Sequence, residues 1–423
     1  MSKSVLQIED EHEQSCLVKK ENESKSWTKI DLLLLVFGSL IHLGDGVEIY
    51  LPGVITQEVS CDLGLTNLQK NFLDCILYLT LTISITISGH LSDRFGRREL
   101  SLLSLYLSIV STVVCAVVAN YATLLLSRAL IGFCVGLNLS IHTVLIAELV
   151  SSKLILADIM LIASLVYTAG GIWCAFLAYL LLEVLGWRTF ILFTSLPIFV
   201  PPIFMLHFCL NKTDAQQAQD LTTNSDSDTE EKIPNFVART TKLGLYCAVN
   251  SFQGWLTILL VPYLIQALKI DEVGSNSDCS TTVIQGLDFL LLALVTFAAV
   301  AGRLFVHHVR HLVCFRTLQL IVAVVNVGCF AGMLAQDNLV VVILTNFIVK
   351  FLFGITAMAA TYILYDADYF GASGLASGSS IAYGIGLNGT VMVSFAPLLS
   401  VKVTAIVVSS LQILIVLSMT EVR

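Results

Sequence analysis

The stretch Gly89-His90-Leu91-Ser92-Asp93-Arg94-Phe95-Gly96-Arg97-Arg98 is a short charged segment between two long apolar runs. Its two glycines permit a tight reversal of the chain, and Asp93 can pair with an arginine. Its three arginines are typical of the cytoplasmic end of a membrane helix. The segment therefore predicts a loop between two membrane helices.

The composition of the whole chain predicts a membrane protein. Of the 423 residues, 56% are hydrophobic and only 13% are charged, and the mean hydropathy is +0.84. A soluble domain of this length needs far less apolar surface. The sequence contains no basic nucleic-acid footprint, no metal-ligand cluster and no phosphate-binding loop. We therefore expect the lipid bilayer as a partner, no nucleic acid and no cofactor.

Apolar runs predict twelve membrane-spanning helices, because each is close to the roughly 20 residues that cross a bilayer. They cover residues 30–50, 69–88, 99–119, 123–147, 159–184, 190–210, 242–265, 284–306, 315–335, 339–363, 374–398 and 402–420. The acidic segment 211–238 lacks apolar periodicity and predicts a cytoplasmic linker. The predicted order is an amino tail (1–29), a six-helix half (30–210), the linker (211–238), a second six-helix half (239–420) and a carboxyl end (421–423).

Charge distribution predicts the orientation. Most of the 23 lysines and arginines fall on the side that holds both termini, and positively charged loops stay in the cytoplasm. The amino tail has no apolar core suited to a cleaved signal. We expect both termini in the cytoplasm, with the protein in the plasma membrane or an intracellular vesicle membrane.

The segment 89–98 resembles the signature between the second and third helices of major facilitator superfamily transporters. A small residue, Gly, Asp, Gly and paired Arg occur in the family's order. The turn at 302–311 is a degraded copy of the segment, with Val306 in the place of Asp93.

A second internal match pairs Arg128-x-x-x-Gly132 with Lys350-x-x-x-Gly354. The resemblance implies two pseudo-symmetric six-helix halves, with substrate bound between them at mid-membrane.

The first span indicates which group within the superfamily the chain resembles. Residues 44–52 are similar to the first helix of the synaptic vesicle glycoprotein 2 and related-protein group, which borders the organic ion carriers. Residues 61–63, 67–71 and 186–188 continue the match. The large first outer loop of organic ion carriers is absent, so a short outer loop that contains Cys61 is expected. The sequence leaves open whether Cys61 bonds to Cys279, which also falls in an outer loop.

Acids in the first span are candidate ligands, because a charge at the bilayer centre costs about 2.5 to 3.5 kcal/mol. Asp45 and Glu48 are three residues apart, with His42 three residues earlier, so the three share one helical face. Two close carboxylates suit a cation or a coupling proton. Alternatively, Glu48 lies at the headgroups and Asp45 pairs with a neighbouring side chain.

Basic and amide side chains complete the candidate substrate site. Arg128 and His142 share a face of the fourth span, where Arg128 is suited to attract an anion or to pair with Asp45. Lys350 lies halfway through the tenth span and is expected to face a central cavity. The seventh span offers two amides and a flat apolar wall, although amides also join helices without touching substrate. These three residues are Asn250, Gln253 and Trp255.

A cytoplasmic gate is the role that the resemblance implies for the charged loop. Glu148, at the end of the fourth span, is expected to meet the arginines of the loop, and Asp93 to lock the loop against the second half. The candidate gating residues are Gly89, Asp93, Arg94, Gly96, Arg97, Arg98 and Glu148.

The favoured function is therefore secondary active or facilitative transport of a small organic solute. The acids and bases within the spans favour an organic ion. The coupling ion is a proton or sodium. The acids suggest a cationic substrate, whereas Arg128 and Lys350 leave an anion open. A non-transporting receptor or trafficking scaffold with the carrier fold is the alternative. A channel fits less well, because no ring of repeated pore-lining charges occurs.

Overall fold

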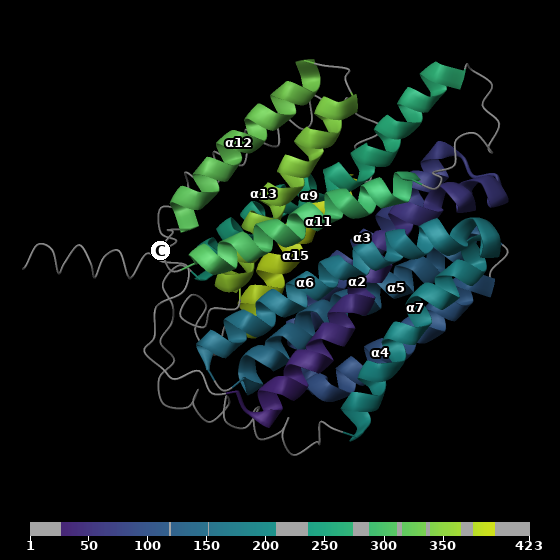
Figure 1. Ribbon diagram of the computed structural model, residues 1–423. Helices are drawn as coiled ribbons and strands as arrows, with labels where there is room; N and C mark the ends of the chain where they lie inside the picture. Colours follow the sequence, from purple (N-terminus) through teal and green to yellow (C-terminus); the bar gives the residue numbers. More distant parts are fainter. Residues whose placement is uncertain are drawn as a thin grey trace, which may run out of the picture.

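The computed structural model describes residues 27–117, 120–150, 152–208, 236–273, 287–310, 315–335, 339–364 and 375–393. The regular elements in these ranges are helices (Figure 1). They are α2 (Lys29–Leu63), α3 (Asn67–Phe95), α4 (Arg97–Val117), α5 (Tyr121–Leu149), α6 (Lys153–Leu177), the π-helical turn η1 (Ala178–Leu182), α7 (Glu183–Phe208), α9 (Phe236–Val273), α11 (Leu287–Val309), α12 (Phe315–Ala335), α13 (Leu339–Leu364) and α15 (Leu375–Val393).

Eleven of the twelve predicted spans coincide with described helices, and the span 402–420 lies outside the described residues. Seven stretches of described helix are long and apolar enough to cross a membrane. One of them, Leu154–His207, contains both the fifth and sixth predicted spans, which separate at Gly186, where φ is 69°. Large apolar side chains such as Ile83, Val110 and Phe193 are exposed on the helices, as expected of surfaces that face lipid. The all-helical, multi-pass membrane fold is confirmed.

The first helix is longer than predicted. Thr28 caps α2 reciprocally with Asp31, whose backbone N donates to Thr28 Oγ1 over 3.2 Å. The helix continues through Pro52 and ends only at Gly64, which has a φ of 60°. Burial of residues such as Val59 stabilises this extension. The expected outer loop around Cys61 is therefore wrong, because Cys61 lies in the last turns of α2.

The charged segment 89–98 is also mostly helical. Helix α3 runs to Phe95, and only Gly96 leaves the helical region, with a φ of 88°. The predicted reversal at Gly89 is wrong, because Gly89 lies within α3, where Ser88 and Ser92 on either side of it are buried. The chain turns at Gly96 alone.

Two groups of helices with the same internal packing make up the described structure. In the first, α2 packs on α6 and α3 packs on α5; in the second, α9 packs on α15 and α11 packs on α13. The two groups meet where α3 contacts α15 and where α6 contacts α11, as Figure 1 shows. These correspondences support the two predicted halves as structural repeats.

Close backbone approach repeats between the halves. A Cβ on Gly132 of α5 would overlap the carbonyl oxygen of Leu77 in α3. A Cβ on Gly354 of α13 would overlap the carbonyl oxygen of Ala299 in α11. The two glycines that the sequence matched therefore permit the same helix contact in each half.

Substitution of Gly132 by Ala is expected to destabilise the protein by about 1 to 3 kcal/mol, because the added methyl must force α3 and α5 apart. Thermal unfolding of the detergent-solubilised protein measures this effect. Gly328→Ala in α12 is the matched control, because a Cβ there meets nothing within 4 Å. An equal loss of stability in both variants would contradict the packing role of Gly132.

Candidate functional site

A layer of polar side chains in the first half separates two buried apolar clusters. Along α2, Ile41 belongs to one cluster and Ile49 to the other. The helix face between them carries His42, Asp45 and Glu48, and all three are buried. Because charged groups are rare at such depth unless they are paired or functional, this layer is the candidate site.

The second half carries polar groups at the same boundary. In α13, Lys350 lies between Val349 of one apolar cluster and Leu352 of the other. In α9, Asn250 is likewise buried between the two clusters. The polar layer is therefore built from both halves.

An ion pair in the first half joins α2 to α5. Arg128 Nη1 lies 3.7 Å from Glu48 Oε2, and the two side chains are 3% and 0% exposed. Thr112 of α4 donates to Glu48 Oε1 over 3.3 Å. Asp45 has a different partner, since Asn138 Nδ2 donates to its Oδ1 over 3.4 Å. Arg128 thus pairs with Glu48 rather than with Asp45.

The hydrogen bonding of this acid cluster is incomplete. Asp45 Oδ2, Glu48 Oε2 and both terminal nitrogens of Arg128 are buried without a hydrogen-bond partner. The cluster contains two carboxylates and one guanidinium, so full ionisation of both acids leaves an excess negative charge in a region of low dielectric. One added proton would remove that excess.

Two histidines lie beside the acid cluster. His142 Nδ1 is 2.8 Å from the carbonyl oxygen of Asn138, its ring meets Phe37 edge-on at 5.3 Å, and its Nε2 is buried without a partner. His42 Nδ1 is 2.8 Å from the carbonyl oxygen of Gly38. Each imidazole is thus oriented by a carbonyl of its own helix.

The amides of α9 join helices within the second half. Thr356 of α13 donates to Asn250 Oδ1. Asn326 of α12 donates to Gln253 Oε1 over 3.1 Å. These contacts match the helix-joining alternative for amides that the sequence left open.

Lys350 and Trp255 come together and reach the first half. Lys350 Nζ donates to the carbonyl oxygen of Gly254 over 2.7 Å and lies 5.7 Å from the centre of the Trp255 ring. The same ring lies 5.1 Å from the ring of Tyr50 and 5.8 Å from that of Tyr78. Trp255 and Lys350 therefore lie where the halves meet. The other predicted residues lie inside one half: Asp45, Glu48, Arg128 and His142 in the first, and Asn250 and Gln253 in the second.

The gating candidates form contacts within the first half. Arg97 Nη2 lies 2.7 Å from Glu148 Oε1 and 3.3 Å from Asp93 Oδ1. The Arg98 guanidinium donates to the carbonyl oxygen of Leu206 over 2.7 Å. The expected meeting of Glu148 with the arginines is thus present, and the structure gives Asp93 a partner in its own half. Arg94 lies over the ring of its neighbour Phe95.

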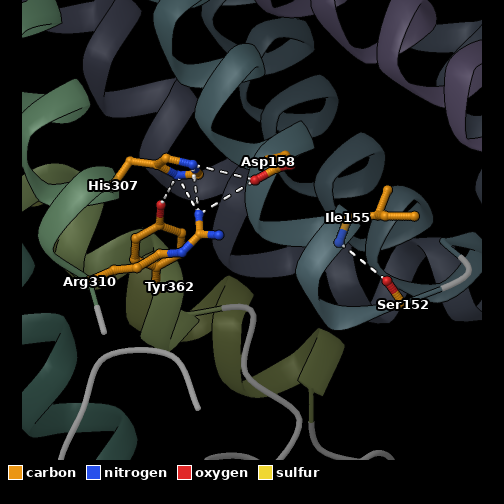
Figure 2. Close-up of polar contacts among 6 residues, drawn as sticks. All are labelled: Ser152, Ile155, Asp158, His307, Arg310 and Tyr362. Carbon is orange, nitrogen blue, oxygen red and sulfur yellow. Dashed lines mark hydrogen bonds and ion pairs between the residues drawn. The ribbon is translucent and has the colours of Figure 1, made fainter. Parts of the chain in front are cut away.

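A polar cluster that the sequence analysis missed links the two halves (Figure 2). Asp158 Oδ1 of α6 lies 3.4 Å from His307 Nε2 of α11 and 3.5 Å from Arg310 Nη1, at the end of α11. Tyr362 of α13 completes it, with its hydroxyl 2.7 Å from His307 Nδ1. Ser152 starts α6 by accepting from the backbone N of Ile155 over 3.3 Å, which fixes the turn that carries Asp158.

One sequence signal pointed towards this cluster. Arg310 falls opposite Arg97 when the turn 302–311 is compared with 89–98. Asp158 gave no such signal, because a single acid near the start of a span is ordinary. The two equivalent arginines, one in each half, thus both pair with an acid of the first half. Arg97 pairs with Glu148, and Arg310 pairs with Asp158.

Cys61 is disulfide-bonded. Six other cysteines of the described residues are free, namely Cys75, Cys115, Cys134, Cys174, Cys247 and Cys329. Cys279, the partner considered from the sequence, lies outside the described residues.

The Major Facilitator Superfamily model matches residues 37–392. The chain belongs to this superfamily. It is 23% identical over 184 residues to the synaptic vesicle 2-related protein of Rattus norvegicus, covering 44% of this chain and 33% of that protein. It is 28% identical over 161 residues to the synaptic vesicle glycoprotein 2A of Homo sapiens, covering 38% of this chain and 21% of that protein.

A solved structure shares the fold. The D-xylose-proton symporter superposes with a TM-score of 0.69 at 15% identity, covering 92% of this chain and 97% of that one. Against the two synaptic vesicle relatives, by contrast, the matched part of the chain spans a third of the length or less. The superfamily and the resemblance to the synaptic vesicle 2 group are therefore confirmed.

Asp158→Asn is expected to weaken the contact between the halves, because it removes the charge that holds His307 and Arg310. Ser140 and Ser380, on α5 and α15, report on this contact because their Oγ atoms are 2.9 Å apart. In a Ser140→Cys, Ser380→Cys protein, oxidative cross-linking should fall by about tenfold or more, since charge-assisted hydrogen bonds contribute about 1.5 to 3 kcal/mol.

Asp93→Asn in the same double-cysteine protein is the control, because the partner of Asp93 lies in its own half. Equal cross-linking in the Asp158→Asn protein and its parent would show that the cluster does not hold the halves together.

Proposed function

We propose that this protein is a carrier that moves a small organic ion across a membrane by alternating access, driven by a coupled proton. Membership of the superfamily supports this proposal, as does a polar layer to which both halves contribute. In this account the solute binds between the halves, which open in turn to each side of the membrane.

The acid cluster of the first half carries the proposal. Glu48 is balanced only loosely by Arg128 at 3.7 Å, and Asp45 has no cationic partner among the described contacts. A buried charge that is costly to keep is retained where it is used. The excess of one carboxylate over the single guanidinium makes the cluster suited to hold one exchangeable proton.

A proton fits this cluster better than sodium. Sodium would need several oxygen ligands with no cation beside them, whereas the guanidinium of Arg128 lies 3.7 Å from Glu48. A proton needs only one carboxylate oxygen, and buried oxygens without a partner are present on both acids. The proton-coupled sugar carrier that shares the fold is consistent with this choice.

The contacts between the halves suit the gate of such a carrier. The cluster of Asp158, His307 and Arg310 joins the halves at one end, through ion pairs that can break and reform. The pair of Arg97 with Glu148 braces the first half near the same end. Breaking the first contact while keeping the second would let the halves separate there as rigid bodies.

The proposal also covers the orientation of the protein and the membrane in which it lies. The concentration of lysine and arginine on one side supports cytoplasmic termini. The exposed pair of Asp62 with Arg188, at 2.6 Å, would then lie at the outer face, beside the bonded Cys61. The plasma membrane or a vesicle membrane is the proposed location.

Glu48→Gln is expected to abolish uphill, pH-driven uptake while it retains exchange of internal for external solute, because exchange needs no net proton movement. Uptake of a metabolite mixture by proteoliposomes, with and without an inward proton gradient, measures both. Glu58→Gln, also on α2, is the matched control and should accumulate solute like the wild type.

Equal accumulation by the Glu48→Gln and wild-type proteins would contradict proton coupling at this cluster. If the folded wild-type protein moved no compound with or without the gradient, the carrier proposal would fail. The receptor or scaffold function would then be favoured.

A further inference from the structure

The side chain of Lys350 is a buried cation without an acidic partner among the residues described. It is 1% exposed, and its Nζ donates to the carbonyl oxygen of Gly254. Its other close neighbours are the rings of Phe353 and Trp255, whose centres lie 4.9 and 5.7 Å from Nζ. An ammonium has three N–H donors, so one carbonyl leaves donor capacity for a ligand.

The surrounding rings compensate this charge only in part. Aromatic faces attract a cation through their quadrupole, but this attraction is weaker than the hydration that a buried ammonium gives up. A lysine kept only to fill space or to hold one carbonyl could be replaced by a neutral residue. A buried amino group at this position therefore points to an anion that arrives and leaves, because such an anion would favour the ammonium form.

A second buried cation faces the same region. Arg303 of α11 is 6% exposed and donates to the carbonyl oxygen of Ser164 in the first half, while its Nε has no partner. Arg303 and Lys350 are thus both buried where the halves meet. An anion bound there would gain from both side chains.

The position of Lys350 suits a site between the halves. The Trp255 ring beside Lys350 also contacts the rings of Tyr50 in α2 and Tyr78 in α3, so Trp255 links Lys350 to the first half. The acids of the first half point elsewhere, since Glu48 contacts Arg128 and Thr112 inside its own half. Positive charge at the meeting of the halves is thus separate from negative charge inside the first half.

We propose that Lys350, assisted by Arg303, binds the carboxylate of an aromatic or flat apolar organic acid, whose ring stacks among Trp255, Tyr50 and Tyr78. This inference rests on the proposed carrier function and names its substrate class as an organic anion rather than an organic cation. It also assigns separate places to the two cargoes, with the solute at Lys350 and the proton at the acid cluster.

Three probes of one shape test the charge preference: benzoate, benzamide and benzylammonium. Their binding to the purified full chain in lipid nanodiscs is measured by calorimetry and by thermal shift. Benzoate should bind and raise the unfolding temperature, and the neutral and cationic probes should bind at least tenfold more weakly.

Lys350→Met should weaken benzoate binding at least tenfold, and Lys350→Arg should restore part of it. Lys242→Met, which removes a lysine from α9 nearer its start, is the matched control and should bind benzoate as the wild type does. The preference of the wild-type protein for benzoate tests the inference even if Lys350→Met fails to fold.

Binding of benzylammonium as tight as that of benzoate, or benzoate binding unchanged in Lys350→Met, would overturn the inference. Uptake of a cation that depends on Glu48, without benzoate binding, would overturn it while the carrier proposal stands. Benzoate binding that depends on Lys350, without transport of any solute, would support the site and contradict the carrier proposal.

Discussion

Burial of charge in an apolar bundle is the constraint on which the rest of the structure depends. Asp45, Glu48, Arg128 and Lys350 are all nearly inaccessible, and each gives up hydration that the protein restores only in part. The apolar clusters on either side keep water away from this layer. Because the buried charges of this layer are only partly compensated, binding of a proton or an anion there would be favourable.

The repeat places these charges on equivalent helices without making them alike. Arg128 and Lys350 occupy matching positions, and Gly132 and Gly354 beside them allow matching backbone contacts. Arg128 has an acid across from it, whereas Lys350 has a carbonyl and two rings. One repeat is thus suited to hold a proton and the other to hold a solute. A single movement of one half against the other would serve both.

Sequence reasoning predicted what depends on composition and period, and missed what depends on contacts between distant helices. The spans, the repeat and the pairing of Glu148 with the arginines followed from apolar runs and motif order. The sequence did not predict where α2 ends, or that Gly89 is helical. In both places tertiary packing keeps the helix intact at a residue, Pro52 or Gly89, that often ends one. The cluster of Asp158 with His307 was missed because the two residues are far apart in the chain. The sequence also could not predict the partner of Arg128. Asp45 and Glu48 lie on one face of α2, and only the packing of α2 on α5 determines which of them meets Arg128.

The most direct test of the account is infrared difference spectroscopy of the purified protein in nanodiscs, recorded between an acidic and an alkaline pH. The account predicts that the band of protonated carboxyl groups in a dry environment loses a titrating component when Asp45→Asn and Glu48→Gln are combined, and keeps that component in Glu58→Gln. A folded protein with the combined substitution that loses no such component would place the exchangeable proton elsewhere and contradict the role of this cluster.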